Sequence, residues 1–271
     1  MKKKLLRVLI ILICIFSLLI LYLSTFGLET KKFNNQIENK IFENSKNFEI
    51  ELKKIRLTLN PLSFNVNAKT IAPKIFYKKN MIQLEYLQAQ ISLLSLIKNQ
   101  IVSSKLKIST KSISFRNLIA FVRATSNKPE LLILERAIKK GQIIVDIDLN
   151  FDETGKINND YEINAILKDG KIELFKNYNF ENINFLLNVK KNNYDFKDIK
   201  FIKNNSKFFS ESIKIVKDEE DFIIEGNIGN KDTILKNELL KFLNIDIQKI
   251  GFLNTNFNSK SKFSFLIDKK F

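Results

Sequence analysis

Residues 143–151 read IIVDIDLNF, and this short segment decides the fold class. From Ile143 to Phe151 every second side chain is apolar, and from position 146 onward the side chains between them are Asp or Asn. Successive side chains of a β-strand point to opposite faces of a sheet, so a period of two places the apolar set on one face. The segment therefore predicts a strand with one apolar face and one face in water.

The same period of two recurs on both sides of this segment. It is present in residues 48–59 with a slip at positions 53–54, and in residues 62–68, 82–91, 102–108, 113–115, 161–174, 183–189, 194–201, 213–215, 222–224 and 263–267. Turn signals separate many of these runs, at residues 60–61, 152–156, 169–170 and 190–193. Successive alternating runs joined by short turns are typical of an antiparallel meander.

A few segments interrupt the meander with helical patterns. In residues 29–42, Phe33, Ile37 and Ile41 form a stripe that suits a helix lying on a membrane surface or a helix packed on its own domain. Residues 129–140 begin with Pro and end before Gly141, which predicts a second helix, and residues 92–100 predict a helical or irregular connection. Residues 232–243 predict a further helix with Asp232 as its N-cap.

An almost unbroken apolar run, residues 5–26, precedes the meander. About 20 helical residues cross the hydrocarbon core of a bilayer, so the run predicts a transmembrane anchor. A cleaved signal peptide is the alternative, but the run is longer than the usual signal and no small-residue cleavage site follows it. Cys14 does not fit a lipoprotein signal, because the bulky Ile13 precedes it.

Basic residues favour a cytoplasmic N-terminus. Lys2, Lys3, Lys4 and Arg7 flank the near side of the run, against two lysines just beyond its far side. We therefore expect a single-pass inner-membrane protein whose bulk is periplasmic. The expected organisation is a tail and anchor in residues 1–28, an amphipathic helix in residues 29–47 and an exported β-rich groove domain in residues 48–271.

The predicted fold is mainly β: an N-terminal transmembrane helix followed by a long antiparallel β-meander with a few short helices. A sheet of this kind must bury its apolar face, and few helices are available to cover it. A sandwich, a closed barrel and a curled sheet whose apolar groove holds something else all satisfy that need. Strands of varied length disfavour an outer-membrane barrel. The expected fold is therefore a groove or an elongated sandwich.

Composition excludes several classes of function. The 271 residues contain no His and no Trp, and the single Cys lies in the apolar run, so His-based catalysis, Cys nucleophiles and Cys/His metal sites are not expected. We expect no enzyme and no cofactor. The net charge of +16 suggests nucleic acid, but the lysines are scattered among apolar and acidic residues and form no dense stripe, so no nucleic-acid partner is expected.

The whole pattern resembles the AsmA-like envelope proteins, which include TamB and related repeating-β-groove proteins. Residues 82–101, IQLEYLQAQISLLSLIKNQI, resemble that family's early strand, helical break and following strand. Residues 139–157, KKGQIIVDIDLNFDETGKI, resemble one of its repeating strand pairs. The resemblance implies an inner-membrane-anchored protein whose periplasmic groove binds or transfers phospholipid and supports outer-membrane homeostasis.

On this resemblance, alternating apolar side chains line the floor of the lipid groove. The expected floor residues are Ile143, Val145, Ile147, Leu149, Phe151, Tyr161, Ile163, Leu167, Ile183, Phe185, Leu187, Val189, Phe263, Phe265 and Ile267. The same residues also suit the ordinary core of a closed sandwich, in which case the protein is a structural or assembly factor that acts through an envelope protein partner.

The predicted groove is short for this family. About a dozen strands at roughly 4.8 Å spacing give a groove on the order of 60 Å. A groove of that length implies a partner that receives the lipid, an oligomer, a shortened relative or an incomplete chain.

Overall fold

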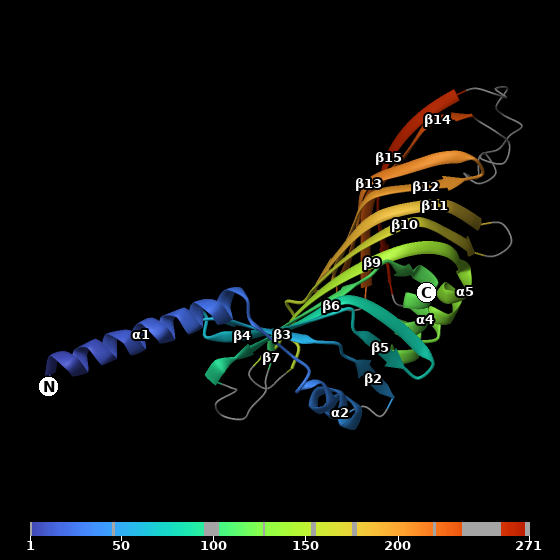
Figure 1. The fold of residues 1–271 in the computed structure, drawn as a ribbon. Helices are drawn as coiled ribbons and strands as arrows, with labels where there is room; N and C mark the ends of the chain where they lie inside the picture. Colours follow the sequence, from blue (N-terminus) through green and yellow to red (C-terminus); the bar gives the residue numbers. More distant parts are fainter. Residues whose placement is uncertain are drawn as a thin grey trace, which may run out of the picture. The chain divides into compact units, whose positions relative to one another are not determined.

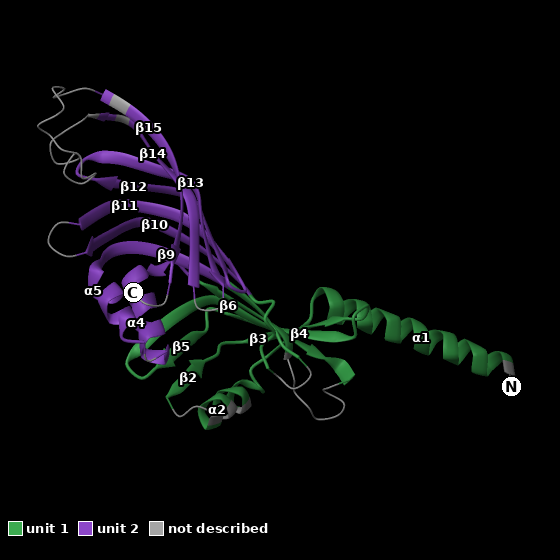
Figure 2. Ribbon diagram, turned by 180° about the vertical axis from the view of Figure 1, so that it is seen from behind, with its two compact units in different colours: residues 1–110, 147–161 green, residues 111–146, 162–271 purple. Residues whose placement is uncertain are grey.

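The computed structural model describes residues 2–44, 47–94, 103–126, 128–152, 156–174, 178–218, 221–234 and 256–268. The chain forms two compact units (Figure 1, Figure 2). Unit 1 comprises Met1–Thr110 and Ile147–Tyr161, and unit 2 comprises Lys111–Asp146 and Glu162–Phe271. Both units consist mainly of antiparallel strands, as the alternating pattern predicts.

Helix α1 (Lys2–Thr25) coincides with the predicted anchor. It is long and apolar enough to cross a membrane by length and composition, criteria that an N-terminal signal sequence also meets. The chain leaves the helix through Gly27, which has a φ of +69° and whose backbone amide donates to the carbonyl of Tyr22. A side chain there would collide with the carbonyl of Leu57, so this tight exit from the helix requires glycine.

Unit 1 is a sheet of short strands. Their order is β1 (Leu28–Thr30), β3 (Ile55–Asn60), β4 (Asn65–Ile71), β6 (Asn80–Ser92) and β7 (Ser103–Thr110), followed by the last residues of β9 (Ile138–Asn150). A branch of β2 (Phe48–Glu51) and β5 (Lys74–Tyr77) pairs with the first residues of β6. The turn predicted after Asn60 is confirmed, because it joins β3 to β4.

The slip at residues 53–54 separates two strands that pair with different neighbours. Helix α2 (Asn34–Asn44) lies against this break: Glu38 accepts a hydrogen bond from the amide of Leu52 at 2.9 Å, and Asn34 donates to the carbonyls of Leu52 and Lys53. Ile41 of α2 packs on the core of this unit. The helix is therefore packed on its own unit, which was one of the two alternatives.

Unit 2 is an open sheet of longer strands. In order they are the first part of β9, β10 (Glu162–Leu174), β11 (Tyr178–Lys190), β12 (Asn193–Lys203), β13 (Ser206–Asp218), β14 (Asp221–Ile234) and β15 (Asn256–Ile267). From β10 to β15 each strand pairs antiparallel with the strand that follows it in sequence. The predicted turn at residues 190–193 joins β11 to β12.

Two helices lie at the β9 end of this sheet. Helix α4 (Phe115–Ser126) follows the two-residue strand β8 (Ile113–Ser114), and α5 (Glu130–Ala137) precedes β9. Helix α5 confirms the helix expected after Pro129, but it is shorter, because Ile138 already begins a strand. The strand expected at residues 113–115 is confirmed at Ile113 and Ser114, and it ends there because Phe115 is the first residue of α4.

Two predictions about unit 2 are wrong. Residues 169–170 do not turn the chain, because β10 continues through them as one 13-residue strand with an internal irregularity. Residue 232 is no helix start, since β14 extends to Ile234. The rest of that predicted helix, most of the connection at residues 92–100 and the centre of the turn at residues 152–156 lie outside the described residues.

Candidate apolar binding face

One side of the unit 2 sheet carries two apolar rows, which we call the apolar face. Each row consists of one residue from every strand from β10 to β15, and each residue lies directly opposite the next on the neighbouring strand. The first row is Ile163, Val189, Tyr194, Ile215, Ile224 and Phe265. The second row is Ala165, Leu187, Phe196, Ile213, Gly226 and Phe263.

Much of the apolar face is partly open to solvent. Ala165 and Val189 are buried, but the large side chains farther along the rows are half-buried and Phe265 is 48 % exposed. Helices α4 and α5 pack on each other. Helix α4 also contacts β8, and α5 contacts β10. The rows from β11 to β15 thus present apolar side chains that a closed core would bury.

The other side of the same strands, the polar face, is held together by hydrogen bonds. The side-chain amide of Asn188 donates to Glu162 at 2.8 Å and to Asn164 at 2.7 Å, and Ser264 donates to Glu225 at 3.3 Å. The bond from Asn188 holds the pKa of the Glu162 carboxyl below its ordinary value. Apolar side chains also lie on this face, among them Ile166, Leu186 and Leu266, so the two sides differ in their share of polar residues.

A line of irregular residues crosses the strands of unit 2. Asp169 in β10, Asn182 in β11 and Asp198 in β12 have φ of +52°, +49° and +51°, and the pairing register shifts beside the first two. Asp and Asn tolerate this left-handed conformation better than other residues with a side chain. Such bulges bend a strand, and the strands of this unit are visibly bent in Figure 2.

Asn184 replaces hydrogen bonds that the sheet loses at this bend. Its side-chain oxygen accepts from the amide of Asp169 at 3.1 Å, and its side-chain nitrogen donates to the carbonyl of Asn182 at 2.7 Å. One side chain thus joins β10 to β11 at the point where their backbones cannot pair regularly.

Asn184→Leu is therefore expected to destabilise unit 2 by about 1–3 kcal/mol, because it leaves two backbone groups without these partners. The measurement is urea-dependent proteolysis of the full chain in detergent. Asn179→Leu is the matched control, since Asn179 is an exposed residue of the same strand whose side chain forms no hydrogen bond with the part of the chain that the structure describes. Equal stability of the two variants would contradict the role given to Asn184.

Beyond the bend, the side of the sheet that carries the apolar face also holds an aromatic cluster around one buried lysine. The rings of Phe180 and Phe201 lie 5.7 Å apart, and those of Phe201 and Phe208 stack at 5.2 Å. The ammonium of Lys203, which is only 2 % exposed, lies 5.4 Å from the rings of Tyr178 and Phe180. Burial lowers the pKa of Lys203.

This shift predicts a pH dependence of stability. Because the folded pKa lies below the unfolded one, the unfolded chain binds more protons between the two values, and the free energy of unfolding rises with pH there. Lys203→Met should flatten that rise below the ordinary lysine pKa of 10.5 in urea unfolding experiments, whereas Lys214→Met, which changes an exposed lysine of β13, should keep it. An unchanged pH profile in Lys203→Met would contradict the prediction.

The predicted floor residues are divided between the two units. Ile147, Leu149, Phe151 and Tyr161 belong to unit 1, and the remaining eleven belong to unit 2. Five of these eleven lie in the two rows: Ile163, Leu187, Val189, Phe263 and Phe265. Ile267 lies beside the first row on β15. Ile143, Val145, Leu167 and Ile183 are buried on the strands nearest the helices, and Phe185 contacts Phe196 edge to face at 5.3 Å.

Sequence reasoning missed the middle of the apolar face. Tyr194, Phe196, Ile213, Ile215 and Ile224 join the β11 part of the rows to the β15 part, yet they are not among the expected floor residues. Their alternation with polar residues in the sequence is the signal that would have included them.

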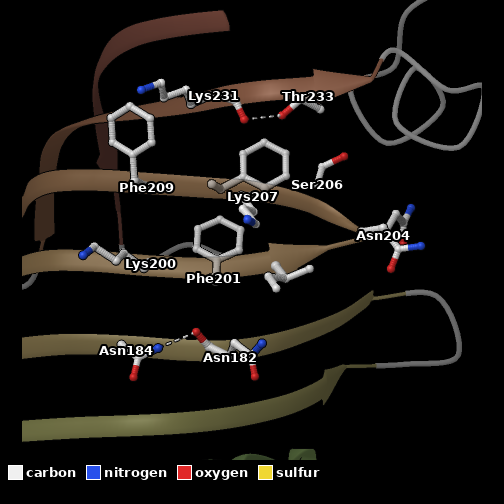
Figure 3. Close-up of a pocket in the computed structure, with 13 residues that line it drawn as sticks. Asn182, Asn184, Lys200, Phe201, Asn204, Ser206, Lys207, Phe209, Lys231 and Thr233 are labelled. Carbon is white, nitrogen blue, oxygen red and sulfur yellow. Dashed lines mark hydrogen bonds between the residues drawn. The ribbon is translucent and has the colours of Figure 1, made fainter. Parts of the chain in front are cut away.

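A separate depression of about 710 Å³ lies where β12, β13 and β14 approach the turn at residues 204–205. Figure 3 shows the residues that line it, with Lys200 on β12, Lys207 and Phe209 on β13 and Lys231 on β14. Lys200 and Phe209 face each other across neighbouring strands, and their side chains alternate with those of Phe201 and Phe208 in the aromatic cluster. The depression is therefore on the polar face.

Comparison with known proteins finds no matching family model, no matching curated protein and no matching solved structure. The likeness to AsmA-like proteins therefore rests on the sequence pattern alone.

Proposed function

We propose that this protein is a membrane-anchored envelope protein of AsmA-like type that binds or transfers phospholipid on the apolar face of unit 2. The observation that carries the proposal is the pair of continuous apolar rows from β10 to β15, with large side chains that remain partly exposed. Acyl chains on such a surface gain roughly 0.8 kcal/mol for each CH₂ group removed from water. The task needs binding and no catalytic group.

In this proposal α1 anchors the chain in the inner membrane as a single span. The basic residues before the span favour a cytoplasmic N-terminus, which places the β-rich bulk in the periplasm. There the protein would support outer-membrane homeostasis by holding lipid that a further envelope protein gives or receives.

The test is native mass spectrometry with lipid analysis of residues 29–271, purified in a gentle detergent. Phospholipid that remains bound after detergent exchange is the expected result. A folded and monodisperse fragment without lipid would contradict the proposal.

A second candidate function rests on the edge strand β15. It pairs with β14 along one side, and no strand of the described part pairs with its other side. An open edge of 12 residues can receive a strand from another protein. An assembly factor of this kind needs no lipid, so a lipid-free fragment that captures an envelope protein through β15 would favour it.

A further inference from the structure

The depression on the polar face of β12, β13 and β14 gathers several lysines and lies on a face where other lysines form ion pairs. Three lysines of unit 2 outside the depression pair with acids: Lys171 with Glu181 at 3.0 Å, Lys197 with Asp195 at 3.1 Å, and Lys190 with Glu162 at 3.3 Å. The bond with Glu181 raises the pKa of Lys171, which reflects this mutual compensation.

The three lysines of the depression are not neutralised in this way. Lys200, Lys207 and Lys231 form no ion pair with any residue that the structure describes, and no carboxylate is among the residues lining the depression. They come from three neighbouring strands, and Phe209 lies between Lys200 and Lys231 (Figure 3). Like charges gathered on adjacent strands oppose folding unless an anion offsets them.

The lining of the depression also has an apolar part. Phe209 and Ile202 belong to it, and the ring of Phe209 lies against Gly229 of β14, where any side chain would approach the ring to 2.8 Å. Gly229 thus leaves room for the ring to lie across the neighbouring strand. Asn184 of β11 also lines the depression.

We propose that this depression binds the phosphate group of an amphiphile, with Lys200, Lys207 and Lys231 contacting the phosphate and Phe209 contacting the adjoining apolar part. Three lysines supply point charges that suit a phosphate, and the aromatic ring provides a surface for the carbon atoms attached to it. The site lies on the opposite side of the sheet from the apolar face, so it does not depend on the proposed function.

The test uses the full chain in a maltoside detergent, which contains no phosphorus, with hexyl phosphate and inorganic phosphate as probes and ³¹P NMR line broadening as the readout. Saturable binding of hexyl phosphate is expected, with affinity at least tenfold weaker in Lys200→Gln/Lys207→Gln/Lys231→Gln. The matched control is Lys171→Gln/Lys190→Gln/Lys197→Gln, which removes the same charge from ion-paired positions on the same face and should change the affinity less than twofold.

Three results would overturn the inference. One is the absence of saturable hexyl phosphate binding, and another is an equal loss in both triple variants, which would mean general attraction to a basic protein. The third is inorganic phosphate binding as tightly as hexyl phosphate, which would remove the role of Phe209. Loss of phospholipid from the apolar face together with intact hexyl phosphate binding would contradict the proposed function alone.

Discussion

Leu187→Asp is expected to lower the phospholipid bound by the protein at least tenfold. Leu187 lies in the second row of the apolar face, directly between Ala165 and Phe196 on the neighbouring strands. A carboxylate there would have to lose its water when an acyl chain covers it, and an unpaired charge in an apolar contact is very unfavourable. The side chain is only half-buried, so the sheet itself should persist.

Leu186→Asp is the matched control for this experiment. Leu186 is the preceding residue of the same strand, points to the polar face opposite Lys197, and is 40 % exposed. The same substitution there should leave bound phospholipid unchanged, as measured by lipid analysis of the purified protein. Equal losses in the two variants would show that β11 does not present lipid on one side only.

Gly141→Val is expected to have the largest effect on stability, a loss of about 2–3 kcal/mol. Gly141 has a φ of +139°, a conformation that residues with a side chain rarely adopt and that costs of order 1–3 kcal/mol. A Cβ at this position would also lie 3.1 Å from the Cα of Gly170 on β10 and 3.5 Å from the Cβ of Phe115 in α4. The substitution would therefore force β9, β10 and α4 apart.

Urea-dependent proteolysis of the full chain measures this loss. Lys140→Val is the control, because Lys140 is the exposed preceding residue of β9 and a surface substitution usually changes stability by less than 0.5 kcal/mol. A Gly141→Val protein as stable as Lys140→Val would mean that the close approach of β9 to β10 contributes little.

The sequence predicts the class of fold and the two-sided chemistry of the sheet, because both follow from a local period. Residues 183–189 alternate in the chain, and in β11 they divide between the apolar and polar faces as expected. The long apolar run likewise becomes α1, since twenty-odd consecutive apolar residues suit few other structures.

The bend in the sheet could not be predicted from the local sequence pattern. Asp169 and Gly170 are typical turn residues, and the sequence alone does not show whether the chain reverses there or continues past a bulge. The choice depends on the neighbouring strand, because Asn184 of β11 accepts the hydrogen bond from the amide of Asp169. A hydrogen bond between residues 15 positions apart cannot be predicted from the local alternation of side chains.

Helix α4 and the buried lysine were missed for related reasons. Residues 115–126 have an apolar side that suits a helix, but the alternation just before Phe115 favoured a strand. A lysine at the end of an alternating strand is normally exposed, and Lys203 is buried because rings from β11 lie beside it. Both outcomes are set by tertiary packing.

The most direct test of the central claim is photo-crosslinking in the living cell at residues that alternate along β12 and β13. A photoreactive amino acid would replace Phe196 or Ile213 on the apolar face and Lys197 or Lys214 on the polar face, in the full chain. We expect phospholipid crosslinks from Phe196 and Ile213 and none from Lys197 and Lys214. Crosslinks to phospholipid from neither pair, or equally from both, would contradict that claim.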